Sequence, residues 1–154
     1  MPEMDRREFV KAAAVVAGAL GSAVGLTSAA EAQEKKDLFA GVNRLEHPKN
    51  PTALEKKHVP KIELLDKSEA GKWLRVQVSA GIGLEHPSAN GHYIQWIELF
   101  VGERPVGRVD LVPTISKGFL TAVVKLPKGK HTLRARLFCN LHGLWEGTKE
   151  IEVV

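Results

Sequence analysis

The segment Thr132-Leu133-Arg134-Ala135-Arg136-Leu137-Phe138 runs directly into Cys139-Asn140-Leu141-His142-Gly143-Leu144-Trp145. In the first segment an aliphatic residue recurs at every second position, which is the pattern of a strand with one buried face. The second segment is a short polar turn with a glycine, and it holds the only cysteine of the chain. A thiolate and an imidazole three residues apart can bind one metal ion. A buried structural cysteine beside a chance histidine is the alternative interpretation.

Six further short segments have strand-like patterns, and turn residues separate them. They cover residues 59–65, 73–78, 93–101, 106–112, 119–126 and 148–154. The segment 93–101 is almost entirely apolar, which predicts a central strand covered on both faces. No helix is predicted after residue 32. About seven short strands with turns between them predict an all-β protein, an antiparallel β-sandwich of immunoglobulin-like outline.

The first 32 residues have the pattern of a targeting signal. Asp5-Arg6-Arg7-Glu8-Phe9-Val10-Lys11 contains twin arginines, and an uncharged stretch rich in Ala, Val and Gly covers 12–26. Ala30-Glu31-Ala32 supplies small residues for cleavage. We therefore predict a twin-arginine signal peptide over 1–32, export of the folded protein to the periplasm, and no stable membrane anchor after cleavage. An N-terminal amphipathic helix or a retained anchor is the alternative.

The remaining chain has the length of one domain. A polar, proline-containing lead-in with little regular structure is predicted over 33–54, and the sandwich over 55–154. The formal net charge is +4 among 154 residues, without a basic cluster, so the sequence has no nucleic-acid-binding signature. A single cysteine excludes an internal disulfide.

Four histidines and the cysteine lie at predicted strand ends or in loops, where they can converge at one end of a sandwich. These residues are His58, His86, His92, His142 and Cys139. Such a donor set suits iron or copper better than magnesium or calcium, which prefer oxygen. Structural zinc normally takes at least two cysteines, and a blue-copper site would need an axial methionine, so iron with one open coordination position fits best. His47 has no paired histidine and is interpreted as a solvated loop residue.

Three motifs together resemble the superoxide reductase family, which comprises neelaredoxin and the iron domain of desulfoferrodoxin. They are Lys57-His58-Val59-Pro60-Lys61-Ile62-Glu63, His86-Pro87 followed by His92-Tyr93-Ile94-Gln95-Trp96-Ile97-Glu98-Leu99, and the cysteine segment 139–145. The resemblance covers about residues 55–154. It implies a non-haem iron centre, square-pyramidal, with four equatorial histidines and the axial thiolate of Cys139. It also implies reduction of superoxide to hydrogen peroxide without release of dioxygen.

The resemblance further implies a role for Lys57, which would attract the superoxide anion and help to orient a proton-donating water. An ordinary surface lysine is the alternative. The family pattern commonly has Glu-Lys-His, in which the glutamate binds the oxidised iron as a sixth ligand. This chain has Glu55-Lys56-Lys57-His58, so its glutamate stands one residue too early. Either the chain bulges so that Glu55 reaches the iron, or water or hydroxide occupies that position.

The principal alternative function is an exported iron-containing carrier in electron transfer or sulfur-compound handling, with the same ligands and no turnover. A metal-free sandwich that binds a partner protein is a third hypothesis. An enzyme outside the cytoplasm needs an electron donor there, such as a rubredoxin-like or other periplasmic carrier. The resemblance also implies a homodimer or homotetramer. Trp145 is expected to cover the site, Trp96 to pack in the core, and His131 to be solvated.

Overall fold

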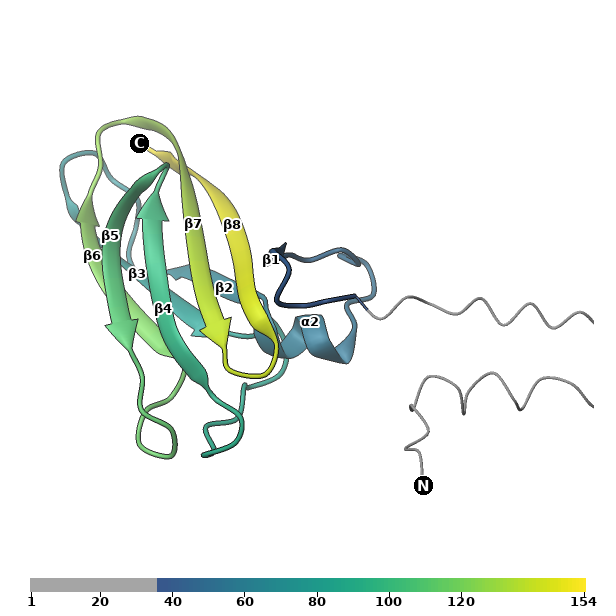
Figure 1. The fold of residues 1–154 in the computed structure, drawn as a ribbon. Helices are drawn as coiled ribbons and strands as arrows, with labels where there is room; N and C mark the ends of the chain where they lie inside the picture. Colours follow the sequence, from purple (N-terminus) through teal and green to yellow (C-terminus); the bar gives the residue numbers. More distant parts are fainter. Residues whose placement is uncertain (1–35) are drawn as a thin grey trace, which may run out of the picture. The chain divides into compact units, whose positions relative to one another are not determined.

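The computed structural model describes residues 36–154, and the predicted signal peptide therefore lies outside the described residues. Figure 1 shows two β-sheets packed face to face, and this confirms the predicted all-β sandwich. The elements in chain order are β1 (Val42–Asn43), α2 (Ala53–His58), β2 (Pro60–Leu64), β3 (Trp73–Ala80), β4 (Ile94–Val101), β5 (Arg104–Asp110), β6 (Phe119–Lys125), β7 (Gly129–Cys139) and β8 (Gly143–Val153). Within residues 36–154, no helix is long and apolar enough to cross a membrane.

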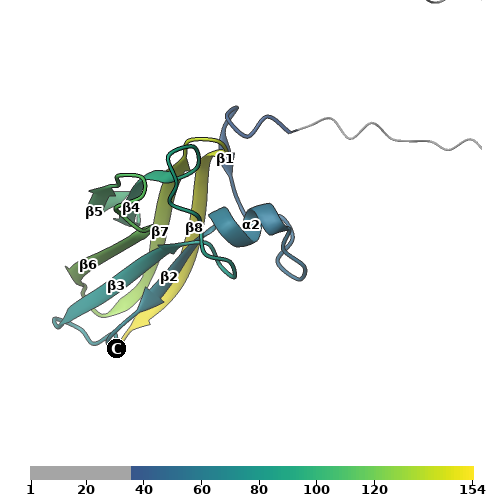
Figure 2. The same cartoon turned by 90° about the horizontal axis from the view of Figure 1, so that it is seen from below.

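The larger sheet has the strand order β1-β8-β7-β4-β5, and the smaller one the order β2-β3-β6. All pairings are antiparallel except that of β1 with β8. The strand β4 is central in its sheet, as predicted, but it is not covered on both faces, because Gln95, Trp96 and Glu98 are only partly buried. The two layers are seen from another direction in Figure 2, where α2 lies beside β2 and β8. In register, Ile94 at the start of β4 faces Cys139 at the end of β7. This pairing brings the two metal-binding motifs of these strands to the same end of the sandwich.

The core fills the space between the sheets with residues from alternate strand positions. In β7, Leu133, Ala135 and Leu137 are completely buried, whereas the arginines between them are only partly buried. Val76 and Val78 of β3 are likewise fully buried on the opposite sheet. Period-two burial is what the alternating sequence predicts. Burial of these side chains supplies the main stabilisation of the domain.

The helix α2 corrects the prediction that no helix follows residue 32. It has six residues, and Thr52 caps it in a capping box with Glu55. Thr-x-x-Glu is a known helix-start signature, so the signal was present in the sequence. The helix ends at His58 because Val59 takes an extended conformation and Pro60 follows it.

The lead-in is more ordered than its polar composition indicated. Its residues Val42 and Asn43 form β1, which pairs in parallel with Leu144 and Trp145. Asn43 is 3% exposed, and its side-chain amide donates hydrogen bonds to the carbonyl oxygens of Leu38 (2.8 Å) and Leu144 (3.0 Å). The lead-in thus lies against the strand that begins directly after His142.

Candidate metal centre

His58 is the last residue of α2, and its side chain is held in one orientation. It is 1% exposed, and Nδ1 lies 2.7 Å from the carbonyl oxygen of Leu54. A carbonyl oxygen can only accept, so Nδ1 carries a proton. Burial lowers the pKa of His58 to about 3, so the ring is neutral at pH 7 and offers the lone pair of Nε2 to a metal.

His86 is arranged in the same way. It is 6% exposed, and its Nδ1 lies 2.8 Å from the carbonyl oxygen of Pro87. The Nε2 atoms of His86 and His58 are 3.1 Å apart. Burial lowers the pKa of both rings, to about 3 for His58 and about 4 for His86, so at pH 7 each carries one proton, on Nδ1, and two Nε2 lone pairs face each other. A cation between the two nitrogens removes this conflict, and two nitrogens bound at right angles to one ion would lie about 3 Å apart.

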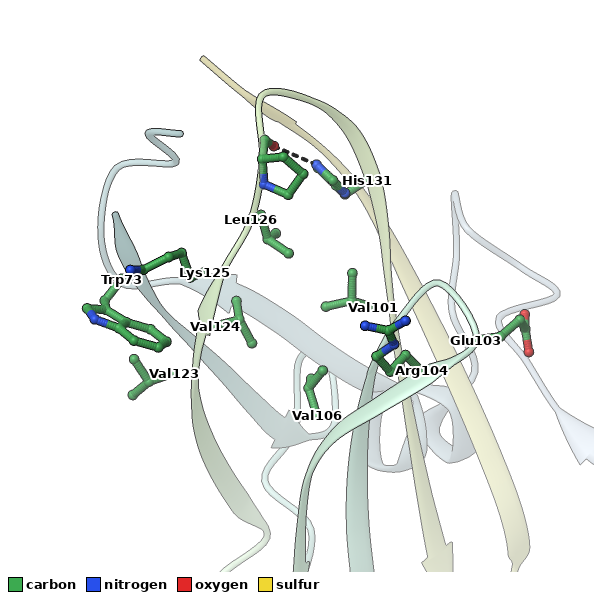
Figure 3. Close-up of a pocket in the computed structure, with 11 residues that line it drawn as sticks. Trp73, Val101, Glu103, Arg104, Val106, Val123, Val124, Lys125, Leu126 and His131 are labelled. Atoms are coloured by element: carbon green, nitrogen blue, oxygen red, sulfur yellow. Dashed lines mark hydrogen bonds between the residues drawn. The ribbon is translucent and has the colours of Figure 1, made fainter. Parts of the chain in front are cut away.

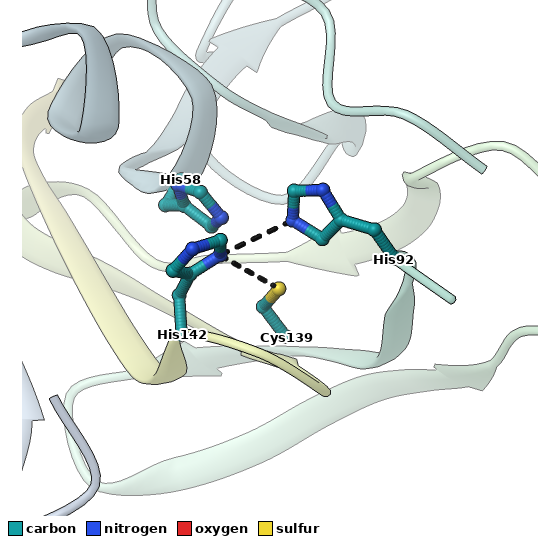
Figure 4. A group of neighbouring side chains, drawn as sticks. All are labelled: His58, His92, Cys139 and His142. Atoms are coloured by element: carbon teal, nitrogen blue, oxygen red, sulfur yellow. Dashed lines mark hydrogen bonds between the residues drawn. The ribbon is translucent and has the colours of Figure 1, made fainter. Parts of the chain in front are cut away.

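The other three predicted ligands complete the cluster, as Figure 4 shows for His92, His142 and Cys139 around His58. The distance from His92 Nε2 to His142 Nδ1 is 3.1 Å, and that from Cys139 Sγ to the same His142 nitrogen is 3.5 Å. Ligand atoms of these four residues all lie within 4.8 Å of one another. His86 adjoins them, with its ring centroid 4.5 Å from that of His92. The structure thus brings all five predicted residues together.

Hydrogen bonds between the loops hold this arrangement. Asn140, in the turn between Cys139 and His142, accepts from the backbone N–H of Tyr93 (2.8 Å) and donates to the carbonyl oxygen of Gly91 (3.0 Å). The turn after β7 is therefore hydrogen-bonded to the residues immediately before and after His92. Sequence reasoning did not single out Asn140, because an asparagine in a turn is usual on local grounds alone.

The electrostatic surroundings favour neutral imidazoles. Burial, together with a smaller effect of the neighbouring imidazoles, lowers the pKa of His58 to about 3 against the opposing hydrogen bond to Leu54. Burial likewise lowers the pKa of His86 to about 4. Burial also raises the pKa of the Cys139 thiol, against the effect of the Leu141 and His142 amide groups. A bound cation would reverse the balance at sulfur, because a coordinating thiol loses its proton.

Trp145 covers the site on its inner side, as expected. It is 2% exposed, and its ring stacks on His58 with centroids 5.2 Å apart. Its indole N–H donates to the carbonyl oxygen of His142 at 2.9 Å. Trp96 differs from the expectation of core packing, because it lies only partly buried on the outer face of its sheet, under the guanidinium of Arg108 at 4.6 Å.

The remaining predicted residues have distinct positions. Lys57 lies close enough to the cluster for its charge to lower the pKa of His86, His92 and His142, after the larger effect of burial. Glu55 is buried, and its carboxylate is bound by Thr52 and by the segment Glu46–His47. His47 is a loop residue with a side chain 58% exposed, as expected.

The donor set fits a redox metal. Four imidazoles and one cysteine sulfur, with Nδ1 of His58 and of His86 fixed by backbone carbonyl oxygens, are typical of sites for iron or copper and unlike the oxygen-rich sites of magnesium or calcium. His92 and His142 are only partly buried, so one side of the cluster is open to a small molecule. The arrangement can therefore hold a metal ion and leave it accessible.

A separate cavity lies away from this centre and is lined by none of its five predicted ligands. It has a volume of about 990 Å³, and Figure 3 shows it between the end of β4, the start of β7 and β6. Trp73, Val124 and Leu126 line it, with Arg104 and Lys125 at its edge. It is therefore at the opposite end of the strands from Cys139 and His92.

Comparison with known proteins places the chain in a family. Residues 50–148 match the family described as Desulfoferrodoxin. A Methanocaldococcus jannaschii relative is 41% identical over 116 residues, covering 73% of this chain and 95% of that one. The superoxide reductase of Pyrococcus horikoshii is 37% identical, covering 62% and 88%. The solved structure of the superoxide reductase (neelaredoxin) from Ignicoccus hospitalis, at 40% identity, has a TM-score of 0.55 and covers 63% of this chain and 81% of that one. This chain belongs to the desulfoferrodoxin family of superoxide reductases and neelaredoxins.

Proposed function

We propose that this protein reduces superoxide to hydrogen peroxide at one non-haem iron ion held by His58, His86, His92, His142 and Cys139. The observation that carries the proposal is the pair of Nε2 atoms of His58 and His86, which face each other 3.1 Å apart in a buried site. A cation between these nitrogens would bind both lone pairs, and the family that the chain belongs to is one of superoxide reductases.

The reaction balances as superoxide plus one electron and two protons giving hydrogen peroxide. An iron ion held by these residues would supply the single electron, and an external donor would restore it. The chain itself fixes the ligand atoms, since the Leu54 and Pro87 carbonyl oxygens hold Nδ1 of His58 and His86. Trp145 and the surrounding core exclude water from the inner side, so that the substrate approaches only from the open side.

Lys57 is the residue that we assign to anion attraction. Its charge lowers the pKa of three of the four imidazoles, so Lys57 lies close enough to the cluster to attract an incoming anion. It also lines a hollow together with His86 and Pro87. A fixed positive charge beside a small-anion site raises the rate of encounter and makes that rate fall as the salt concentration rises.

Rapid mixing of the reduced, iron-loaded protein with superoxide tests the function. We expect a bimolecular reaction close to the diffusion limit, and Lys57→Met should slow it roughly three- to tenfold and weaken its salt dependence. The matched control is Lys56→Met on the same helix, because the side chain of Lys56 packs beside Gly83 instead. A slow reaction of the wild-type protein would favour the carrier function. Equal rates for the two variants would refute the role of Lys57.

We also propose export and a periplasmic electron donor. The twin arginines and the following uncharged stretch support export. Replacing Arg6 and Arg7 together by lysine should keep the protein in the cytoplasmic fraction; an unchanged distribution would refute the route. The homodimer or homotetramer implied by the family resemblance remains a prediction that light scattering can decide.

A further inference from the structure

The carboxylate of Glu55 has no lone pair left for a metal. Oε1 accepts from the backbone N–H groups of Glu46 (2.6 Å) and His47 (3.0 Å). Oε2 accepts from the backbone N–H (2.7 Å) and hydroxyl (2.8 Å) of Thr52. A carboxylate offers about four acceptor sites, and these four donors occupy them. The side chain is also buried, at 4% residue exposure, so no water competes for it.

These bonds tie a loop to the start of α2. Thr52 and Glu55 form the capping box, with Thr52 Oγ1 accepting from the Glu55 N–H at 3.2 Å. Through Glu46 and His47, the same carboxylate holds the preceding loop against the helix, and the His47 ring lies beside it at 3.2 Å. The segment Glu46-His47-Pro48 is not part of the metal centre, but its backbone N–H groups connect the loop to α2.

The other end of α2 is held as well. The carbonyl oxygen of Lys56 accepts from the N–H groups of Ile82 (3.0 Å), Gly83 (3.3 Å) and Leu84 (3.1 Å), in the turn that leads to His86. An isolated six-residue helix is not stable in water, so α2 depends on these two attachments. Lys57 and His58, a predicted ligand, follow directly after these two attachments in the chain.

We propose that Glu55 is a positioning residue that latches the Glu46–His47 segment onto α2, and so fixes His58 and Lys57, and that it is not a ligand of the iron. The inference rests on the proposed function, because the position of His58 affects iron binding only if His58 is an iron ligand. Burial alone would raise the pKa of Glu55, but hydrogen bonds from Thr52, Glu46 and His47 lower it to about 2. The carboxylate is therefore charged at neutral pH and accepts all four hydrogen bonds.

Two variants separate the latch from ligation. Glu55→Gln keeps the size of the side chain and turns Oε2, which accepts twice from Thr52, into a donor. Thr52→Val removes the hydroxyl of the same capping box and leaves the carboxylate in place. In the metal-free protein, we expect each to lower Tm by roughly 4–8 °C. The double variant should lose less than the sum, because the two residues act as one unit.

The iron-loaded proteins give the second measurement. Both variants should release iron to a chelator faster than wild type, by a similar factor, and both should keep the position of the ferric absorption band. Thr52→Ser retains the hydroxyl and should restore the wild-type release rate. A band shift in Glu55→Gln without one in Thr52→Val would make Glu55 a ligand and overturn the proposal.

An unchanged metal-free Tm in Glu55→Gln would also overturn it. If Glu55→Gln does not fold, iron release from Thr52→Val decides alone: faster release supports the latch, and wild-type release overturns it. The metal-free measurements require no reaction with superoxide. Failure of the latch and failure of the proposed function are therefore distinguishable.

Discussion

Replacing Gly143 by alanine should destabilise the turn that carries His142, for two separable reasons. Gly143 has a φ of 71°, a left-handed conformation that costs a residue with a Cβ about 1–2 kcal/mol. An added Cβ would also lie 2.2 Å from the carbonyl oxygen of Leu38. That oxygen is held by the Asn43 amide at 2.8 Å, so it cannot move aside without breaking a buried hydrogen bond.

Gly71 provides a matched control, because it has the same φ of 71° and nothing within 4 Å of the added Cβ. Gly71→Ala should therefore cost about 1 kcal/mol, since alanine also restricts the unfolded chain and recovers part of the strain. Gly143→Ala should cost roughly 1–3 kcal/mol more, which is the usual penalty of overpacking. For a domain of this size, the difference corresponds to roughly 3–15 °C in Tm.

Thermal unfolding of the metal-free proteins, followed by circular dichroism, measures this difference directly. Iron retention gives a second measure, because Gly143 pairs with Cys139 in the register of β7 and β8, so a displaced Gly143 moves both sides of the turn. Equal losses of Tm in the two variants would show that the close approach of Leu38 does not constrain the turn, and would refute this reasoning.

Acid should destabilise the metal-free protein through its buried histidines. Burial lowers the pKa of His58 to about 3 and that of His86 to about 4, against an ordinary value of 6.5, so their contribution is complete above pH 6.5 and is lost as the pH falls towards 4. Each should contribute roughly 1.4 kcal/mol per pH unit across this range, measured by urea unfolding. A free energy of unfolding that stays constant between pH 6.5 and pH 4 would contradict this expectation. Separately, Cys139→Ser should abolish the thiolate-to-iron absorption band, since a serine hydroxyl stays protonated at neutral pH. Retention of that band, with iron content measured in parallel, would exclude Cys139 as a ligand.

The strands were predictable because their burial follows a local period of two. The segment Leu133 to Leu137 shows this most clearly, since its alternate residues are fully buried. The helix α2 was missed because six residues are too few for a helical period to appear in an apolar pattern. Thr52 and Glu55 nevertheless carry the capping signature, which is a local signal independent of periodicity.

The metal centre could not be obtained from local patterns in the same way. His58 and His86 are 28 residues apart, and only the fold brings their Nε2 atoms within 3.1 Å. The five residues were first singled out by donor type and by their positions at predicted strand ends or in loops, and the resemblance of three motifs to a known family supported the same set. The contacts that hold the loops in place, such as the three N–H groups on the Lys56 carbonyl oxygen, join segments distant in the chain and leave no mark in the sequence.

The position of Trp145 has an optical consequence. Its indole stacks on His58 in the dry interior, whereas Trp73 is 65% exposed and Trp96 lies on an outer face beneath Arg108. With Trp73 and Trp96 changed to phenylalanine, all tryptophan fluorescence would come from one ring in contact with a metal-binding residue. Quenching of that emission would then report loading and loss of the ion in real time, without any added dye.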